Sequence, residues 1–459
     1  MGSTLPPTLL FGYLSKADPT TPAFTVTGAG TISVKAGTEV AVGATPFYYP
    51  AATAVTMPSL AAGTDYAIYQ CSDGSILADA SFTAPSGYTT ANSRQIGGFH
   101  YAPGGNAAAL SKIAVAAGTA IGAQTVTANK WALYLLSINS AGAITVTPAA
   151  GNVAGYSTEA LAIAALPTTP ALQFLMGYIT VLTASGLAWI AGTDALAGGS
   201  SGNPATTTNY YPNSGSGIGL TLARGSVDTA IANTAFTYVL GGNTTPAINP
   251  YSVWDIKFRP RCVDPRGMAL VAGRFWCDIY LTNTATDANG SSRYGLAICS
   301  GGVPPKIPAA FGGNGSTAYG EFNWWDANEV VASVGKRLLT TAEFQIAAYG
   351  TTEESSCGSD PGTTGLQGGT YTSKWGLFQA TGCYWVWGLD LGGPYSASSW
   401  TQSTGNRGQF FDMPNAVLLG GNFGNGPDSG SRASNWEYAA SISGGNIGAR
   451  GCADHIMIA

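Results

Sequence analysis

Glycine and proline divide the apolar stretches of this chain into short pieces. The 459 residues include 63 glycines and 25 prolines, and runs such as Ala23-Phe24-Thr25-Val26 and Thr31-Ile32-Ser33-Val34 end after a few residues. Pieces this short do not suit most helices, whereas the Thr, Val and Tyr that fill them suit strands and Gly suits the turns between them. We therefore predict a largely β protein with many short strands.

The balance of charged and apolar residues excludes several classes of protein. Only 9% of residues are charged and 45% are hydrophobic, so the chain is expected to fold rather than stay disordered. The net charge of −5 argues against nucleic acid as a partner, because phosphate binding needs clustered Lys and Arg. With two histidines a His-rich metal site is excluded, and we expect no metal and no cofactor. The seven cysteines form no CxxC pair, which predicts mostly reduced, buried thiols and assembly in a cytoplasm.

Neither a secretory signal nor a membrane span is predicted. The start, Met1-Gly2-Ser3-Thr4-Leu5-Pro6, has no basic or apolar stretch of the kind that a secretory signal needs. Residues 171–192 are uncharged and pass a hydropathy test for a membrane helix. However, Thr183-Ala184-Ser185-Gly186 lies between two apolar runs and predicts a hairpin, so we expect no membrane insertion.

The chain changes character near residue 250. The first 250 residues hold 14 charged residues and two of the eleven Trp. The rest of the chain holds 29 charged residues and nine Trp. We predict a multidomain protein, with β-rich N-terminal modules at 1–60, 61–110 and 111–245 and an α+β domain at 246–459. Residues 1–60 hold too little apolar sequence for a core of their own, which suits strands shared between subunits.

Local signals place several elements before residue 250. Two hairpins are predicted, one turning at Ser72-Asp73-Gly74 and one between 131–138 and 144–146. A short helix is expected at 158–166, capped by Ser157 and ended by Pro167. Residues 198–216 are predicted to be a loop or linker. Asn106 and Asn243 each follow Gly-Gly, so the region 111–245 is a candidate inserted module.

The second part begins with strands predicted at 253–258 and 275–281. A helix at about 325–334 is ended by Gly335, and a second helix starts at a capping box in which Glu343 follows Thr340 by three residues. Phe344, Ala347 and Ala348 share one face of this helix, and Gly350 stops it.

Three segments resemble known proteins. Trp324-Trp325-Asp326-Ala327, continued by Gly335-Lys336-Arg337-Leu338 and Thr340-Thr341-Ala342-Glu343, resembles the formylglycine-generating-enzyme branch of the C-type lectin fold. Gly430-Ser431-Arg432-Ala433, Trp436, Gly448-Ala449-Arg450-Gly451-Cys452 and Asp454-His455 resemble the variable region of retroelement-diversified proteins of the phage major tropism determinant family. The segment Arg94-Gln95-Ile96-Gly97-Gly98-Phe99-His100-Tyr101-Ala102-Pro103-Gly104-Gly105-Asn106 is similar to a phage tail-protein motif. The resemblance implies a C-type lectin-fold domain at 246–459, with a variable region at about 416–459.

The resemblance also assigns roles to single residues. Framework positions would be Phe423, Gly430, Arg432, Trp436, Gly448, Arg450, Gly451 and Asp454, with Trp436 expected to be a buried anchor. Variable, receptor-contacting positions would be Gly424, Asn425, Asp428, Ser434, Asn435, Glu437, Tyr438, Ile442, Gly444, Asn446 and Ile447. Diversification at template adenines turns Asn codons into a restricted set of residues, and Glu437 alone departs from that set.

Other interpretations of these residues stay open. Asn, Ser and Gly are also ordinary turn residues. Arg432 and Arg450 could bind an anion, but we favour framework roles in which they bond loop carbonyls and pair with an acid such as Asp454. Trp385, Trp387 and Trp436 could stack on sugars, although the alternation around Trp385 and Trp387 puts at least one face in a core.

The resemblance implies a phage tail-fibre receptor-binding protein, an adhesin that recognises a bacterial surface receptor, protein or glycan, through a hypervariable site. It would be a homotrimer in the distal tail fibre of the virion, made in the host cytoplasm and joined to other tail-fibre proteins. The alternatives are a tailspike-like glycan depolymerase and a bacterial surface-displayed variable lectin.

Residue types argue against an enzyme. Cys452 has no close cysteine partner in sequence, and neither His100 nor His455 lies in a nucleophile motif. Glu353 and Glu354 are adjacent and point apart on any regular element, although paired carboxylates that meet only in the fold stay open.

Overall fold

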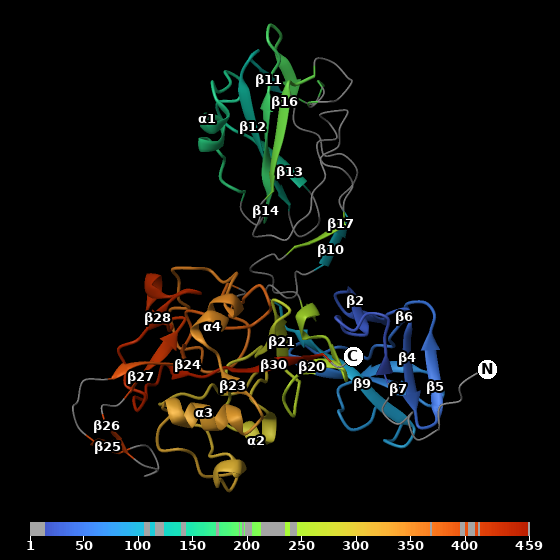
Figure 1. Ribbon diagram of the computed structural model, residues 1–459, viewed down its shortest axis with the longest axis vertical. Coiled ribbons are helices and arrows are strands. Elements are labelled where there is room, and N and C mark those ends of the chain that lie inside the picture. Colours follow the sequence, from blue (N-terminus) through green and yellow to red (C-terminus); the bar gives the residue numbers. More distant parts are fainter. Residues whose placement is uncertain are drawn as a thin grey trace. The chain divides into compact units, whose positions relative to one another are not determined.

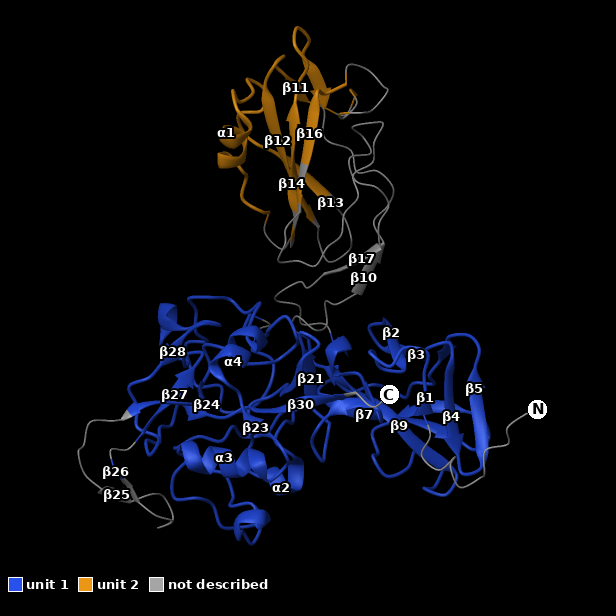
Figure 2. Ribbon diagram, viewed as in Figure 1, with its two compact units in different colours: residues 1–109, 241–459 blue, residues 110–240 orange. Residues whose placement is uncertain are grey.

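The chain divides into two compact units (Figure 2). The computed structural model describes residues 14–457 apart from 105–110, 115–123, 139–143, 171–173, 192, 195–196, 198–203, 213–234, 239–245, 368–369, 395–399, 403–408 and 412–413. Unit 1 comprises Met1–Ala109 and Gly241–Ala459, and unit 2 comprises Leu110–Leu240. The finer division at residues 60, 110 and 245 stays a prediction.

The N-terminal strands of unit 1 form two small antiparallel sheets. One contains β1 (Leu14–Ser15), β4 (Thr38–Val42) and β5 (Thr45–Tyr49), and the other contains β2 (Phe24–Gly28), β3 (Thr31–Val34) and β6 (Thr53–Ala54). Their buried Phe24, Ile32 and Val40 share one core with Ile68 and Phe99 of the strands that follow. The expectation that these strands need another subunit for a core is therefore wrong for residues 14–60, and the trimer itself stays a prediction.

A ten-stranded sheet joins the first hundred residues of unit 1 to its C-terminal part (Figure 1). The predicted turn at Ser72-Asp73-Gly74 is confirmed, with Gly74 at φ +91°, and it connects the first two of these strands in an antiparallel hairpin. The strands are β7 (Thr64–Cys71), β8 (Ile76–Asp79), β9 (Ser93–Ala102), β18 (Ala247–Ile248), β19 (Trp254–Asp255), β20 (Phe258–Pro260), β21 (Met268–Val271), β22 (Phe275–Asp278), β23 (Arg337–Leu338) and β30 (Gly451–Met457).

The predicted continuous strand at 253–258 is wrong. After the 3-10 turn η4 (Pro250–Ser252), the chain reverses between β19 and β20. Asp255 causes the reversal, because its Oδ1 accepts hydrogen bonds from the backbone N–H groups of Lys257 at 2.7 Å and Phe258 at 2.8 Å. Its Oδ2 lies 2.8 Å from the Nζ of Lys16 in a buried ion pair.

A four-stranded sheet in the order β28-β27-β24-β29 lies between two helices of unit 1 (Figure 1). Val417 and Leu419 of β27 pack in one core with Phe344, whereas Ala416 and Leu418 pack in another with Val330. This alternation along a strand gives each helix its own face of the sheet. The elements of this region are α2 (Thr286–Asn289), η5 (Ala309–Phe311), α3 (Trp324–Ala332), α4 (Thr341–Ala347), β24 (Trp385–Pro394), β25 (Trp400–Gln402), β26 (Gln409–Phe411), β27 (Pro414–Leu419), η7 (Gly426–Asp428), β28 (Ser434–Asn435) and β29 (Ile447–Gly448).

Both helices start at capping boxes. The predicted box of α4 is confirmed: Thr340 Oγ1 accepts from the N–H of Glu343 at 3.2 Å, and Glu343 Oε2 accepts from the N–H of Thr340 at 3.0 Å. The box of α3, formed by Asn323 and Asp326, was not predicted, and the helix begins one residue before the expected Trp325.

Unit 2 is a second β structure with a single described helix. Its main sheet has the order β13-β12-β14-β16, from β12 (Trp131–Ile138), β13 (Ile144–Pro148), β14 (Phe174–Leu182) and β16 (Thr207–Pro212). The predicted hairpin of β12 and β13 is confirmed. Two further pairs are β11 (Gln124–Val126) with β15 (Trp189–Ala191), and β10 (Ser111–Ala114) with β17 (Ala235–Tyr238).

Three local expectations in unit 2 are wrong. The strands on either side of residues 183–186 do not pair with each other, because β14 pairs with β12 and β16 while β15 pairs with β11. Helix α1 (Glu159–Ala164) is capped by Thr158 rather than Ser157. The expected linker at 198–216 contains strand β16. Within the described residues, no helix has the length and apolarity that a membrane crossing requires.

The two chain segments that lead to unit 2 start from one place in unit 1. Ala102 at the end of β9 is the antiparallel partner of Ala247 in β18. Unit 2 therefore lies in the connection of a two-stranded pair, which is compatible with the candidate insertion at 111–245. That insertion stays a prediction.

Candidate functional site

The predicted variable positions lie on the two edge strands of the four-stranded sheet, β28 and β29, and on the loops beside them. Strand β28 pairs with β27, with Asn435 opposite Leu418 and Ser434 opposite Leu419. Strand β29 runs parallel to β24, with Ile447 opposite Trp385. This pairing brings two segments of the variable region, twelve residues apart in sequence, to the same sheet.

A cavity of about 410 Å³ opens between these segments. We call it the asparagine cavity, because four of its lining residues are Asn; it is lined by Trp385, Leu418, Asn422, Asn425, Asn435, Tyr438, Ile442, Ser443, Gly444, Asn446 and Ile447. Seven of the eleven predicted variable residues are in this lining: Asn425, Asn435, Tyr438, Ile442, Gly444, Asn446 and Ile447. The lining contains no charged side chain, so the cavity offers amide groups, a hydroxyl and aromatic or aliphatic surface to a ligand.

Side chains around the cavity differ in how far they reach solvent. Tyr438 is 40% exposed and Ile442 is 38% exposed, whereas Ile447 is buried at 4%. Ile447 packs with Leu418 and Trp387 in the core that faces α3. An exchange of Ile447 would therefore disturb packing, which is at odds with its predicted role as a freely variable contact.

Four predicted variable residues lie outside this lining. Gly424, Ser434 and Glu437 are exposed, and Asp428 lines a separate hollow of about 480 Å³. We call this second feature the acidic hollow, because Glu353, Glu354 and Asp428 line it together with Arg432, Tyr349 and residues 427–433.

The loop at 422–431 is held by its own polar side chains. Asn425 Oδ1 accepts from the N–H of Asn422 at 2.8 Å, and Asn422 Oδ1 accepts from the N–H of Gly424 at 2.7 Å. Gly421 at φ +83° takes a conformation that favours glycine, and a Cβ there would meet Ser429 at 2.2 Å. Asn425 thus shapes the loop with its carbonyl oxygen and offers its amide to the cavity.

A second segment, residues 353–357, supports this loop from beneath. Ser356 Oγ donates to the carbonyl of Phe423 at 3.0 Å and accepts from the N–H of Gly426 at 3.0 Å. Glu353 Oε2 accepts from the N–H of Ser431 at 2.8 Å. We call residues 353–357 the support segment. Sequence analysis missed it, since nothing local marks Ser356 as a partner of residues 423 and 426.

Arg450 has the framework role that we predicted, with other partners than expected. Its Nη1 donates to the carbonyls of Asp278 at 2.7 Å and Ile279 at 2.9 Å, and its Nη2 donates to those of Phe378 at 2.6 Å and Gln379 at 3.2 Å. Burial lowers the pKa of this guanidinium from its ordinary value. The expected pairing with Asp454 is wrong, because Asp454 Oδ1 lies 3.0 Å from Arg337 Nη2.

The predicted framework role of Trp436 as a buried anchor is wrong in the described chain. Trp436 is 42% exposed and lies against Gly392 of β24, while its Nε1 donates to Ser434 Oγ at 3.2 Å. Arg432 is exposed at the acidic hollow. Phe423 is half-buried, with an edge-to-face contact of 5.9 Å between its ring and that of Tyr384.

Trp385 and Trp387 both pack in the core that faces α3, as the strand alternation indicated. Trp387 is fully buried, and its Nε1 donates to the carbonyl of Phe322 at 3.4 Å. Trp385 is half-buried and lines the asparagine cavity. Trp385, Leu418, Asn422 and Ser443 are cavity residues that sequence analysis did not assign to the site, although Trp385 was named as a stacking candidate.

Both histidines have structural partners. His100 is buried, with Nδ1 3.0 Å from Asp65 Oδ1 and Nε2 2.9 Å from the hydroxyl of Tyr280. His455 Nδ1 accepts from Trp276 Nε1 at 2.8 Å. Among the residues that the structure describes, no three His, Cys, Asp or Glu side chains gather in a way that could hold a metal ion.

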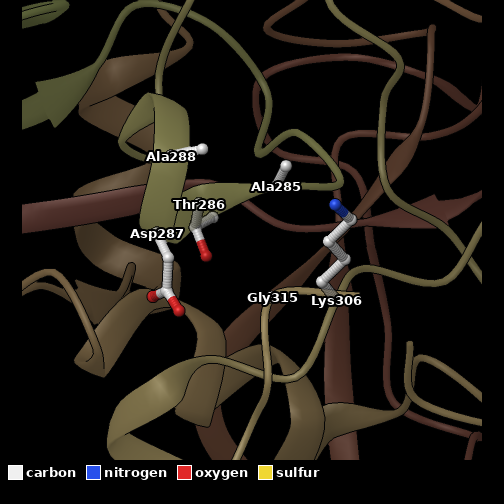
Figure 3. Close-up of a pocket in the computed structure, with 6 residues that line it drawn as sticks. All are labelled: Ala285, Thr286, Asp287, Ala288, Lys306 and Gly315. Atoms are coloured by element: carbon white, nitrogen blue, oxygen red, sulfur yellow. The ribbon is translucent and has the colours of Figure 1, made fainter. Parts of the chain in front are cut away.

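A third, smaller cavity of about 50 Å³ lies beside α2 (Figure 3). It is lined by Ala285, Thr286, Asp287, Ala288, Lys306 and Gly315. The Asp287 carboxylate in this cavity accepts from the N–H of Ala309 at 2.7 Å, which gives it a structural role. None of the predicted site residues lines it.

Comparison with known proteins gives one consistent result. The family model described as the Mtd second domain matches residues 22–131. The "Tail fiber receptor-binding protein" of Bordetella phage BPP-1 is 36% identical over 451 residues, covering 96% of this chain and 84% of that protein. Among solved structures, the Major Tropism Determinant U1 variant has a TM-score of 0.65 at 36% identity, covering 97% of this chain and 86% of its own. The P3c variant has a TM-score of 0.67 at 35% identity, covering 99% and 89%. The chain therefore belongs to the major tropism determinant family of phage proteins.

Proposed function

We propose that this chain is a phage tail-fibre receptor-binding protein that contacts a bacterial surface receptor at the asparagine cavity. One observation carries the proposal: seven of the eleven residues that the sequence resemblance assigned as variable line one cavity, from segments at 425, 435–444 and 446–447. Its relative from Bordetella phage BPP-1 is described as a tail fiber receptor-binding protein.

The composition of the cavity suits adaptable recognition. Tyr, Asn, Ser and Gly dominate antibody binding loops, where an aromatic ring supplies contact area and small polar groups supply hydrogen bonds. The cavity offers Tyr438 and Trp385 for contact area, and Asn435 and Asn446 for polar contacts. The receptor surface that fits this lining is uncharged and polar, with an apolar group for Ile442.

The proposal has parts that concern the whole particle. The domain at 246–459 would have the C-type lectin fold, with the β-sheet and helices α3 and α4 as the rigid base of the site. The protein would act as a homotrimer in the distal tail fibre, joined to other tail-fibre proteins. Several copies would raise the effective affinity of a weak single site without new contacts.

Cell binding of the full chain tests the proposal. Labelled protein is titrated onto a panel of bacterial strains, beside an Asn435→Ala/Tyr438→Ala double variant and a Ser434→Ala/Glu437→Ala control from the same segment, outside the cavity. Saturable binding to a strain that is lost in the cavity variant and kept in the control is the expected result. Unchanged binding of the cavity variant would place the contact elsewhere, and equal loss in both folded variants would show that it is not confined to the cavity.

A second function, glycan depolymerisation, is favoured by one observation. Glu353, Glu354 and Asp428 come together around the acidic hollow, although Glu353 and Glu354 are adjacent in sequence. Two carboxyl groups on either side of a glycosidic bond are what such hydrolysis requires. New reducing ends released from host polysaccharide, and absent with a Glu354→Gln variant, would support this function over binding alone.

A further inference from the structure

The support segment carries one of two cysteines that lie close together beneath the 422–431 loop. The backbone N–H of Cys357 donates to the carbonyl of Gly382, the residue before Cys383, at 2.9 Å. Both side chains belong to the same packed cluster. All seven cysteines are free in the reduced chain.

Each of the two cysteines is tied to the loop. The carbonyl of Cys383 accepts from the N–H of Phe423 at 3.1 Å, and residue 383 forms a bridge with Asn422. On the other side, Ser356 bonds the backbone at residues 423 and 426, and the N–H of Glu354 donates to the carbonyl of Ser429 at 2.9 Å. A covalent link between residues 357 and 383 would therefore fix, relative to each other, the two chain segments that hydrogen-bond to the loop.

We propose that Cys357 and Cys383 are a disulfide-forming pair, reduced during synthesis and oxidised when the protein meets a medium that contains a small-molecule disulfide. The bond would hold the support segment against strand β24 and so stiffen the 422–431 loop. The proposal concerns the chain's own chemistry and does not depend on the identity of any receptor.

The chemistry suits the positions of the two groups. Cys357 is half-buried and reachable, while Cys383 is fully buried. The neighbouring Cys383 thiol lowers the pKa of Cys357 below its ordinary value, which favours the thiolate that attacks a disulfide. Cys262, the other half-buried cysteine, has its pKa raised to about 11 by burial.

The reaction proceeds by two exchanges. The Cys357 thiolate attacks one sulfur of oxidised glutathione, the S–S bond of glutathione breaks, and one glutathione thiolate leaves. The buried Cys383 then attacks the Cys357 sulfur, and its proton passes to the departing second glutathione, which leaves as the thiol. Two protein thiols are oxidised to one disulfide, and one oxidised glutathione is reduced to two thiols.

Mass spectrometry of the full chain tests the pair. Protein purified in reductant is exposed to oxidised glutathione, its remaining thiols are blocked, and the peptides are mapped. The expected result is five blocked cysteines and a linked peptide pair containing residues 357 and 383. A Cys262→Ser control should form the same link, and Cys357→Ser should form none.

Two further readouts follow from the link. Because it closes a loop of about 25 residues, oxidation should raise Tm by about 5 °C in the parent and not in Cys357→Ser. Hydrogen exchange should slow at residues 353–357 and in the 422–431 loop. Seven blocked thiols after oxidation, or a stable glutathione adduct on Cys357 that Cys383 never displaces, would overturn the proposal.

Discussion

The Nη2 of Arg450 donates a 2.6 Å hydrogen bond to the carbonyl oxygen of Phe378 inside the core of unit 1. With the three further carbonyls that this guanidinium reaches, it ties the start of β30 to the end of β22 and to the turn at 378–379. The planar guanidinium group donates hydrogen bonds to four backbone oxygens, which a buried apolar side chain would leave without donors.

Replacement of Arg450 should therefore destabilise unit 1 strongly. We expect Arg450→Met to lower the free energy of unfolding by about 3 kcal/mol or more, because buried carbonyls lose charged donors. Urea unfolding of both proteins measures the difference. The matched control is Arg432→Met, at an exposed arginine of the same sequence motif, with an expected change within about 0.5 kcal/mol. Equal effects of the two changes would contradict the framework role.

Acid should weaken the ionic cluster that Asp264 forms with Arg266 and Arg293 in unit 1. Burial alone would raise the pKa of Asp264, but hydrogen bonds from Arg266 and the charge of Arg293 outweigh it and lower the pKa from 3.8 to about 2. Because the folded pKa lies below the unfolded value, the carboxylate stabilises the fold above about pH 4, and this contribution is lost as the pH falls to about 2.

The variant Asp264→Asn should reproduce that loss at neutral pH. We expect it to cost on the order of 1–2 kcal/mol at pH 7, after allowance for the partial exposure of the arginines, and almost nothing near about pH 2. Urea melts at the two pH values check the prediction, with exposed Glu437→Gln as the control. A cost for Asp264→Asn that does not change with pH would show that packing rather than charge stabilises this cluster.

Deletion of unit 2 should leave a chain that still folds. The register pair Ala102 and Ala247 places both ends of its connection side by side, so a short turn in place of residues 105–245 would restore a simple hairpin. We expect the shortened chain to fold with a cooperative melt and to keep the binding of the full chain. Circular dichroism and the cell-binding titration test this, and an aggregated product would show that unit 1 needs its insert.

The structural features that were predicted correctly from the sequence are those that depend on residues close together in the chain. The capping box of Thr340 and Glu343 and the turn at Gly74 lie within four residues of chain, and both are confirmed. The hairpin expected around residues 183–186 does not form, because turn residues end one strand but do not determine which strand pairs with the next one. Strand β15 pairs with β11, more than sixty residues earlier in the chain.

The same limit applies to the candidate site. Trp436 was expected to be a buried framework anchor, yet it packs against Gly392, a residue of another strand with no side chain to cover the ring. The support segment was missed for a similar reason, because Ser356 is ordinary in sequence and acquires its role only when the 422–431 loop lies on it.

Exchange of cavity residues should change recognition at little cost in stability. Tyr438 and Asn435 point to a cavity and are not part of the cores, so an Asn435→Ser/Tyr438→Ser double variant should shift Tm by only about 2 °C while altering strain preference. Thermal melts and the strain-binding panel measure the two effects. Ile447→Ser is the contrasting variant, and it should destabilise by about 2 kcal/mol or more because its side chain is buried. Unfolding of the double variant would contradict the role of Asn435 and Tyr438 as exchangeable, receptor-contacting positions.

Footprinting of the bound protein tests the central claim most directly. The full chain is oxidised by hydroxyl radicals free and when saturating host envelope, and the modification of each aromatic residue is measured. We predict protection of Tyr438 and Trp385 at the asparagine cavity, with unchanged modification of Tyr349 at the acidic hollow and of Tyr48, which is 64% exposed. Protection of Tyr349 without protection of Tyr438 would contradict the account.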